Sequence, residues 1–251
     1  MPGFHLQKNE EIKIDVIVDI TSNPCYNYCN KRNYNKNKEE LLMKIAVVAA
    51  NGRTGKLITA EAIERGLDVT AIVRRDNKSA ATQVIQKDIM DLTKEDLASF
   101  DVVIDAFGTW DPEKMDQHSA TLGHLSDILA GTKTRLLVVG GAGSLYTDQT
   151  HTTMISDLPT FPDAFQPVAQ GMKKSLDALR KRTDVNWTYI SPAADFQAEG
   201  PRTGSYTLAG EEFTTNKKGE SAISYADYAI AMVDEAQQGQ HNQERISVHS
   251  K

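Results

Sequence analysis

An apolar stretch, a run of small residues and a helical pattern follow one another within residues 44–73. Ile45–Val48 (IAVV) is typical of a strand buried on both faces of a parallel sheet. Ala49–Gly55 (AANGRTG) follows at once, then a helical pattern that stops at Gly66 and a second expected strand at Val69–Val73. This order of strand, tight turn, helix and strand occupies about 30 residues, which is the length of one mononucleotide-binding unit.

The loop after the first strand predicts a pyrophosphate site. The backbone must turn sharply and approach two phosphates, and a Cβ atom would obstruct it. Unpaired N–H groups and the helix dipole then bind the negative charge. In a G-x-x-G-x-x-G spacing Gly52 and Gly55 match, whereas Ala49 replaces the first glycine and loses easy access to positive φ. A plain strand-to-helix turn is the alternative. The residues expected to contact a nucleotide here are Ala49, Asn51, Gly52, Arg53, Thr54 and Gly55.

The residues after the second strand favour one nicotinamide cofactor over the other. A carboxylate there would accept a hydrogen bond from the ribose 2′-OH of NAD(H), but the chain has Arg74 and Arg75, with Arg53 in the loop itself. Guanidinium groups suit a 2′-phosphate. Asp76 follows directly and is the candidate for the NAD role. We therefore expect NADP(H) to be favoured over NAD(H).

Alternating strands and helices continue to the end of the chain. They predict an α/β fold, a Rossmann-like doubly wound parallel sheet in a single domain over residues 43–251, with a small C-terminal excursion on the substrate side. Ligands of such sheets bind at the carboxyl ends of the strands. The further residues expected to contact the cofactor there are Asp88, Ala106, Phe107, Gly108, Gly140 and Gly141.

The remaining elements are expected at defined ranges. Strands are predicted at 84–89, 101–107, 135–139, 187–190 and 246–248, and helices at 94–100, 115–130, 163–182 and 225–238. Thr93 and Ser224 are the expected N-caps, and Gly239 the expected stop of the last helix. Residues 205–208 and 212–215 are expected to form a hairpin-like excursion.

The first 42 residues differ in composition from the rest. They hold seven of the twelve asparagines and both cysteines, Cys25 and Cys29. Such a polar segment buries too little apolar area to offset the entropy of ordering it. We expect residues 1–42 to be a disordered or non-native extension, with Met43 as the native start.

Composition and charge exclude several function classes. The net charge of −6 argues against a partner with a phosphate backbone, so we expect no nucleic acid. The longest apolar run is six residues, Ile45–Ala50, so we expect no membrane span and a cytoplasmic protein. Two cysteines spaced C-x3-C are too few for a zinc site, and no metal is expected.

Lys44–Val248 resembles the atypical short-chain dehydrogenase/reductase group of NAD(P)H-binding proteins. The likeness is to bacterial NADH-flavin reductases, which are related to biliverdin reductase B and more distantly to NmrA-like redox sensors. The segments that carry it are KIAVVAANGRTG (44–55), VTAIVR (69–74), DVVIDAFG (101–108), WTYISP (187–192), RTGSY (202–206) and SYADYA (224–229). The resemblance implies a Rossmann fold, a reduced nicotinamide cofactor and a flavin-like acceptor (FMN or FAD), which is a small molecule.

The usual catalytic pair of that group is incomplete in this chain. Typical members have Tyr-x-x-x-Lys on the helix after the fifth strand, and here the helix contains Ala169 and Lys173 without the tyrosine. Hydride transfer to a flavin mainly requires that two rings be stacked and oriented. Ser144 and Lys173 are the candidate catalytic residues, and an ordinary loop serine is the alternative for Ser144. Phe107, Trp110 and Tyr146 are candidates for a stacking platform, and His118 and His124 are expected to be surface or packing residues.

Two other functions remain open. The absent tyrosine is compatible with an NmrA-like protein that senses NAD(P) and catalyses nothing. An epimerase or dehydratase acting on a nucleotide sugar would require that tyrosine, and usually a larger C-terminal domain. The sequence leaves the acceptor and the oligomeric state open.

Overall fold

The computed structural model describes residues 42–251, of which residues 43–251 form one compact unit. The prediction of a disordered or non-native extension concerns residues almost wholly outside the described range. The strands are β1 (Lys44–Val48), β2 (Asp68–Val73), β3 (Gln83–Gln86), β4 (Val102–Asp105), β5 (Arg135–Val139), β6 (Asn186–Ser191), β7 (Asp195–Gln197), β8 (Thr207–Ala209), β9 (Ala222–Ser224) and β10 (Glu244–His249). The α-helices are α2 (Arg53–Glu64), α3 (Lys94–Leu97), α4 (Gln117–Leu129), α5 (Gln166–Leu179) and α6 (Tyr225–Gln238).

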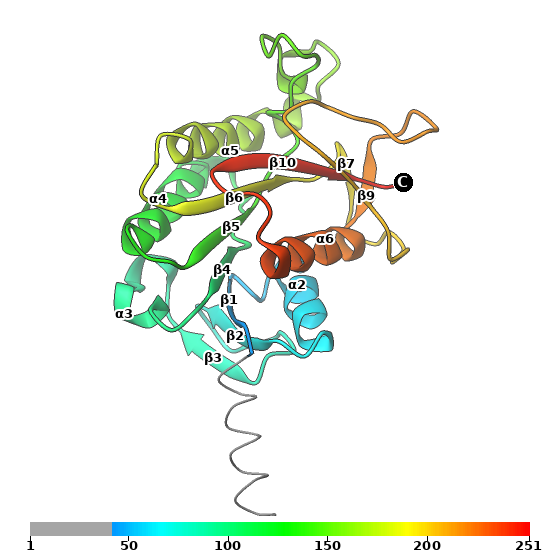
Figure 1. The fold of residues 1–251 in the computed structure, drawn as a ribbon. Helices are drawn as coiled ribbons and strands as arrows, with labels where there is room; N and C mark the ends of the chain where they lie inside the picture. The colour runs from blue at the N-terminus through cyan, green and yellow to red at the C-terminus, as the bar shows by residue number, and fades with distance from the viewer. Residues whose placement is uncertain (1–41) are drawn as a thin grey trace, which may run out of the picture. The chain divides into compact units, whose positions relative to one another are not determined.

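The described strands build a twisted central sheet in the order β3-β2-β1-β4-β5-β6-β10-β8 (Figure 1). Neighbouring strands are parallel, except that β8 runs antiparallel to β10 at one edge. The strand order reverses between β1 and β4, so the crevice outside their carboxyl ends is where this architecture binds ligands. The predicted doubly wound α/β fold is confirmed.

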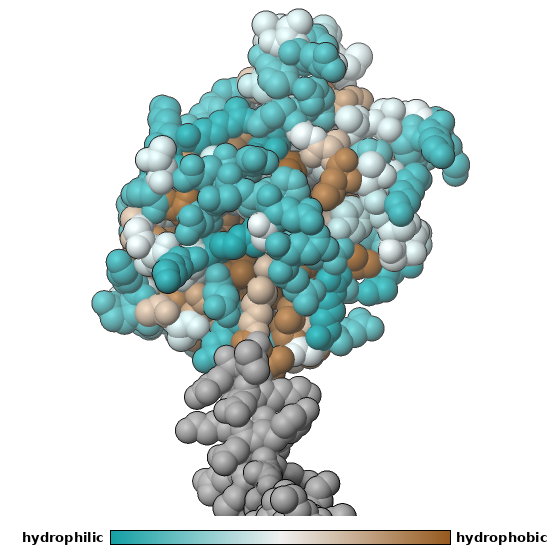
Figure 2. Space-filling model, in the orientation of Figure 1, coloured by the Kyte–Doolittle hydropathy of each residue, from teal (hydrophilic) through white to brown (hydrophobic). Residues whose placement is uncertain are grey.

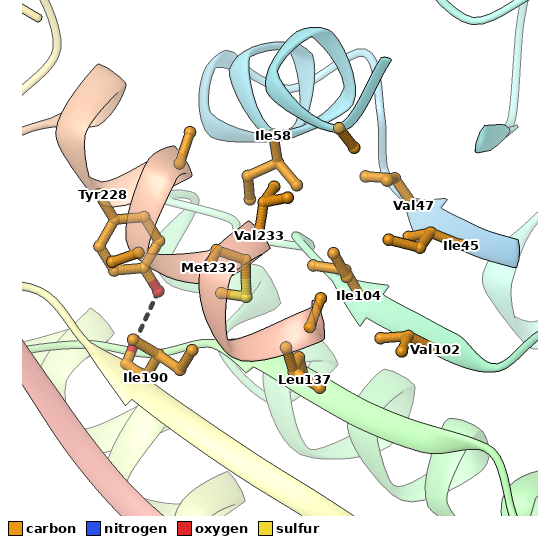
Figure 3. Close-up of a cluster of buried hydrophobic side chains, with 14 of the residues drawn as sticks. Ile45, Val47, Ile58, Val102, Ile104, Leu137, Ile190, Tyr228, Met232 and Val233 are labelled. Carbon is orange, nitrogen blue, oxygen red and sulfur yellow. Dashed lines mark hydrogen bonds between the residues drawn. The ribbon is translucent and has the colours of Figure 1, made fainter. Parts of the chain in front are cut away.

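Helices cover both faces of the sheet because each has one apolar side. On one face α2 packs against α6, and Ile58, Met232 and Val233 meet side chains of β1, β4 and β5 (Figure 3). On the other face α3, α4 and α5 cover a second cluster that includes Leu125 and Leu176. Strands buried by helices on both faces account for the apolar run at 45–48.

Several local predictions from side-chain chemistry are confirmed. Thr93 and Asp96 form a reciprocal capping box at α3, and the Ser224 hydroxyl accepts a hydrogen bond from Asp227 N at 3.0 Å at the start of α6. Gly239 ends α6 with φ of 60°, a conformation that favours glycine. Helix α3 is shorter than predicted and ends at Leu97.

The third strand is shorter than the predicted range 84–89. β3 ends at Gln86, and the Asp88 carboxylate accepts a hydrogen bond from Met90 N at 3.1 Å to cap a 3₁₀ turn, Ile89–Asp91. Such a local bond gives the backbone an alternative to the strand ladder. The prediction that Asp88 lies in a strand was therefore wrong.

The predicted hairpin at 205–215 was wrong as well. β8 pairs with β10, whereas Glu212 makes only an isolated bridge to Tyr146. A long-range partner therefore replaces the local one. Sequence reasoning also missed β7 and β9, which pair in parallel as a separate small sheet.

On the face drawn in Figure 2, hydrophilic residues predominate and hydrophobic ones occupy small separate areas. Among the helices in the described range, none combines the length and the apolar character needed to cross a bilayer.

Candidate functional site

The turn between β1 and α2 presents backbone N–H groups toward the carboxyl edge of the sheet. Gly52 N donates to Ala49 O at 2.8 Å, which closes the turn, and Gly52 is the N-cap of α2. Glycine has no side chain to cap the helix, so the N–H groups of its first turn stay available to an anion. The 12-residue helix adds its dipole to that site.

Close packing within this loop explains why it contains glycines. A Cβ atom on Gly55 would lie 2.6 Å from Ala49 O and 3.0 Å from Ala50 Cα, both backbone atoms. On Gly52 it would lie 3.2 Å from Ala49 O. The loop can therefore fold this tightly only with glycine at position 55, whereas a Cβ atom at position 52 requires a small shift of its neighbour. Such a compact loop fits a dinucleotide.

Ala49 adopts a backbone conformation that favours glycine. Its φ is +56°, in the left-handed region. This conformation costs an L-residue with a Cβ atom roughly 1–2 kcal/mol of conformational free energy. The position thus has the geometry expected of the first glycine of the motif, and alanine occupies it at some cost in strain.

The arginines and Asn51 lie beside this loop. Arg74 and Arg75 are exposed, and Arg74 Nη1 lies 3.7 Å from an Asp88 carboxylate oxygen. The Asn51 side chain donates to Asp76 O at 3.0 Å and accepts from Lys78 N at 2.6 Å. Asn51 therefore holds the loop after β2 against the phosphate loop, and leaves the guanidinium groups accessible.

A pocket of about 480 Å³ extends from Thr54 at the start of α2 across the carboxyl ends of β4, β5 and β6. Six of the residues predicted to bind the cofactor line it: Thr54, Ala106, Phe107, Gly108, Gly140 and Gly141. A second pocket of about 490 Å³ lies at the amino ends of the strands, near Met43 and Asp101. Because ligands of doubly wound sheets bind at the carboxyl ends, the pocket at Thr54 is the candidate site.

The structure does not bring Ser144 or Lys173 to this pocket. Ser144 is buried, and the Arg245 guanidinium donates to its Oγ and carbonyl at 3.4 and 3.3 Å. Lys173 Nζ lies 2.5 Å from Asp177 Oδ2 on the outer side of α5, whereas its neighbour Met172 faces the pocket. Successive helical side chains diverge by about 100°, which places Lys173 outside.

Of the predicted stacking residues, Phe107 and Trp110 line the pocket, whereas the Tyr146 ring stacks on His151 at 4.5 Å. His118 is buried and also lines the pocket. Its Nε2–H donates to Thr109 O at 3.1 Å, and desolvation lowers its pKa, so the imidazole is neutral at pH 7. His118 is thus a packing residue, as predicted, but one in the wall of the site.

A buried carboxyl group that sequence reasoning did not single out lies beneath the pocket. Asp105 ends β4 and accepts a hydrogen bond from Phe107 N at 3.0 Å. A cavity of about 10 Å³ separates it from His118 and Tyr189, which is enough for roughly one water molecule. Burial raises the pKa of Asp105 to about 6 and that of Tyr189 to about 12.

We expect Asp105→Asn to stabilise the protein above neutral pH. The pKa of the Asp105 carboxyl rises from 3.8 to about 6 on folding. Between pH 3.8 and about pH 6 the native state therefore keeps a proton that the unfolded state has lost, and the free energy of unfolding falls as the pH rises through this range. We compare the free energy of unfolding of the variant with that of wild type at each pH. The difference in favour of the variant should be about 2–3 kcal/mol larger at about pH 8 than at about pH 4. Urea denaturation at both pH values measures this, with the exposed Asp116→Asn as control. A pH-independent difference would contradict the prediction.

A doubly wound sheet with a glycine-containing turn ahead of α2 and a pocket at the strand ends defines a dinucleotide-binding protein of the Rossmann type. The chain belongs to the NAD(P)H-binding family, whose profile matches residues 49–238. It is 44% identical over 212 residues to the uncharacterized protein YwnB of Bacillus subtilis, covering 83% of this chain and 99% of that one.

Solved structures agree with this assignment. A putative NADH-flavin reductase from Streptococcus pneumoniae is 55% identical, with a TM-score of 0.82 and coverage of 83% of this chain and 100% of that one. A putative epimerase from Bacteroides thetaiotaomicron is 31% identical, with a TM-score of 0.73 and coverage of 83% and 97%. The predicted resemblance to NAD(P)H-binding proteins of this group is therefore confirmed.

Proposed function

We propose that the protein is an NAD(P)H-dependent oxidoreductase that reduces a free flavin or a similar planar acceptor. The pocket is the observation that carries the proposal. It is continuous from Thr54, beside the phosphate loop, to the aromatic rings of Trp110 and Phe165. A dinucleotide held at one end and a flat acceptor at the other would share this one cavity. The name of the Streptococcus pneumoniae neighbour supports the same reaction class.

Each part of the site has a role in this proposal. The N–H groups at the start of α2 bind the pyrophosphate, and the backbone at Ala106–Gly108 and Gly140–Gly141 leaves room for the nicotinamide. A bound cofactor would supply the hydride, and solvent would supply the proton that reduction of the acceptor to its dihydro form also requires. The apolar walls orient the acceptor and exclude other water from the ring faces.

The side chains near the pocket favour an acceptor that needs no dedicated protein acid. Ala169 stands where typical short-chain dehydrogenases have tyrosine, and it lines the pocket. Lys173 is paired with Asp177 outside it. Carbonyl reduction gains from a positioned acid, whereas flavin reduction depends mainly on ring orientation.

The direct test follows the absorbance of NADPH in the presence of the purified full chain and FMN or riboflavin. We expect flavin-dependent oxidation of NADPH above the uncatalysed rate. Measurable NADPH binding with no oxidation for any flavin would overturn the proposal and favour a non-catalytic NAD(P) sensor. Conversion of a nucleotide sugar without net oxidation would instead indicate an epimerase.

We further propose that NADP(H) is preferred over NAD(H), through Arg74 and Arg75. Both guanidinium groups are exposed beside the loop, where a 2′-phosphate would lie. The double variant R74A/R75A should bind NADPH about tenfold more weakly and leave NADH affinity nearly unchanged. Isothermal titration with each cofactor measures this, and Lys181→Ala, beyond the end of α5, is the control. Equal losses for both cofactors would contradict a role for these arginines in selectivity.

A further inference from the structure

The acceptor end of the pocket is apolar and lacks cationic side chains. Phe161, Phe165 and Met172 contribute to its wall. Within residues 42–251, the pocket is lined by no lysine or arginine, and its sole charged lining residue is Asp195. His118 adds no positive charge, because desolvation lowers its pKa. An anionic group on an acceptor would find no counter-charge on these walls.

The segments that border this end are acidic. Residues 110–116 (WDPEKMD) carry Asp111, Glu113 and Asp116, and their one lysine, Lys114, lies 2.5 Å from the Asp111 carboxylate. Asp163 is exposed between two lining residues, Pro162 and Phe165. The field at the mouth is therefore negative and repels phosphate groups.

Two exposed aromatic rings offer apolar area to a flat molecule, which would stack on one ring and meet the edge of the other. Trp110 is 63% exposed and Phe165 is 48% exposed. Their ring centroids lie 5.7 Å apart with an interplanar angle of 67°. A planar ligand that covers exposed aromatic side chains at a pocket mouth removes their apolar surface from water, which favours binding.

We propose that the acceptor is a planar molecule without a phosphate group, so that the site selects riboflavin-like rings over their phosphorylated forms. This inference rests on the proposed function, because it assigns the substrate class of the same pocket. Trp110 and Phe165 attract the ring of either form, so the selection arises from repulsion of the phosphate by the acidic segments and from the lack of a counter-charge on the pocket walls. The cofactor's own phosphates are bound at the other end, by the α2 terminus and the arginines.

Riboflavin and FMN form a matched pair of probes, because they share the isoalloxazine ring and differ in one phosphate. Flavin fluorescence anisotropy, with the full chain saturated with NADP⁺, gives both dissociation constants. We expect riboflavin to bind about five- to tenfold more tightly than FMN at low ionic strength. The ratio should fall toward one in about 1 M salt, where the Debye length is about 3 Å. FMN binding as tightly as riboflavin at low salt would overturn the inference.

Charge variants test the cause of the selection. E113Q/D163N removes two acidic groups at the mouth without changing the aromatic walls, and should tighten FMN binding while leaving riboflavin binding nearly unchanged. E95Q/E244Q removes two exposed carboxylates at the amino-terminal side of the sheet and is the charge-matched control. An equal effect of both double variants on FMN would assign the selection to net charge rather than to the mouth, and would contradict the inference.

Activity measurements keep the two proposals separable. If NADPH is oxidised with both flavins and neither flavin binds more tightly, the proposed oxidoreductase function stands and the proposed preference for acceptors without a phosphate group is refuted. Selective binding of riboflavin without any oxidation of NADPH retains the pocket's specificity and refutes the reaction.

Discussion

Gly55→Ala is expected to weaken NADPH binding and to destabilise the fold. The added Cβ atom would lie 2.6 Å from Ala49 O and 3.0 Å from Ala50 Cα, so the loop or the start of α2 must move. Backbone atoms cannot rotate away as a flexible side chain can. Such overpacking costs roughly 1–3 kcal/mol, and displacement of the N–H groups should weaken NADPH binding by about tenfold or more.

Gly123→Ala is the matched control for this substitution. Gly123 lies within α4, and a Cβ atom there would meet nothing within 4 Å. The substitution should stabilise the protein by up to about 1 kcal/mol through helix propensity, with NADPH affinity unchanged. Calorimetric titration and thermal denaturation of both variants provide the measurements. Wild-type NADPH affinity in Gly55→Ala would show that the loop does not bind the pyrophosphate as described.

Strands and capping residues could be predicted from sequence because their causes are local. The buried run at Ile45–Val48, the capping residue Thr93 and the stop at Gly239 each depend on neighbouring residues alone. The parallel sheet followed from the βα alternation, since successive parallel strands need a crossover connection between them. The part of the pocket lined by Ala106–Gly108 and Gly140–Gly141 followed from where those strands end.

The elements that were missed depend on contacts distant in sequence. β8 pairs with β10, which lies some 40 residues away in the sequence, and no turn motif predicts that pairing. Ser144 was predicted to be catalytic from its position after a strand. In the structure its hydroxyl is buried and accepts a hydrogen bond from Arg245, which is 101 residues away in the sequence. For His118 the sequence left a surface role and a packing role open. Its burial could have been predicted, because it lies four residues before Leu122 and seven before Leu125, on the buried face of α4.

The largest loss of stability outside the phosphate loop is expected for Glu211→Gln. Arg245 on β10 has a side chain with no exposed area, and its guanidinium donates to the Glu211 carboxylate through Nε at 2.8 Å and also through Nη2. Arg180 reaches the same carboxylate at 2.6 Å. Burial lowers the pKa of Arg245 more than the Glu211 carboxylate raises it. A guanidinium group still keeps its charge at neutral pH, so the buried charge needs that carboxylate as its counter-ion.

The neutral amide that Glu211→Gln introduces would leave a buried guanidinium without its counter-ion, which costs about 3–5 kcal/mol. The neighbouring Glu212→Gln is the control, because Glu212 pairs with the exposed His151 at 2.8 Å and solvent screens that contact. Chemical denaturation should therefore give a much lower midpoint for Glu211→Gln and a midpoint close to wild type for Glu212→Gln. Similar midpoints for the two variants would mean that water reaches Arg245 and that the ion pair does not stabilise the contact between β10 and the segment after β8.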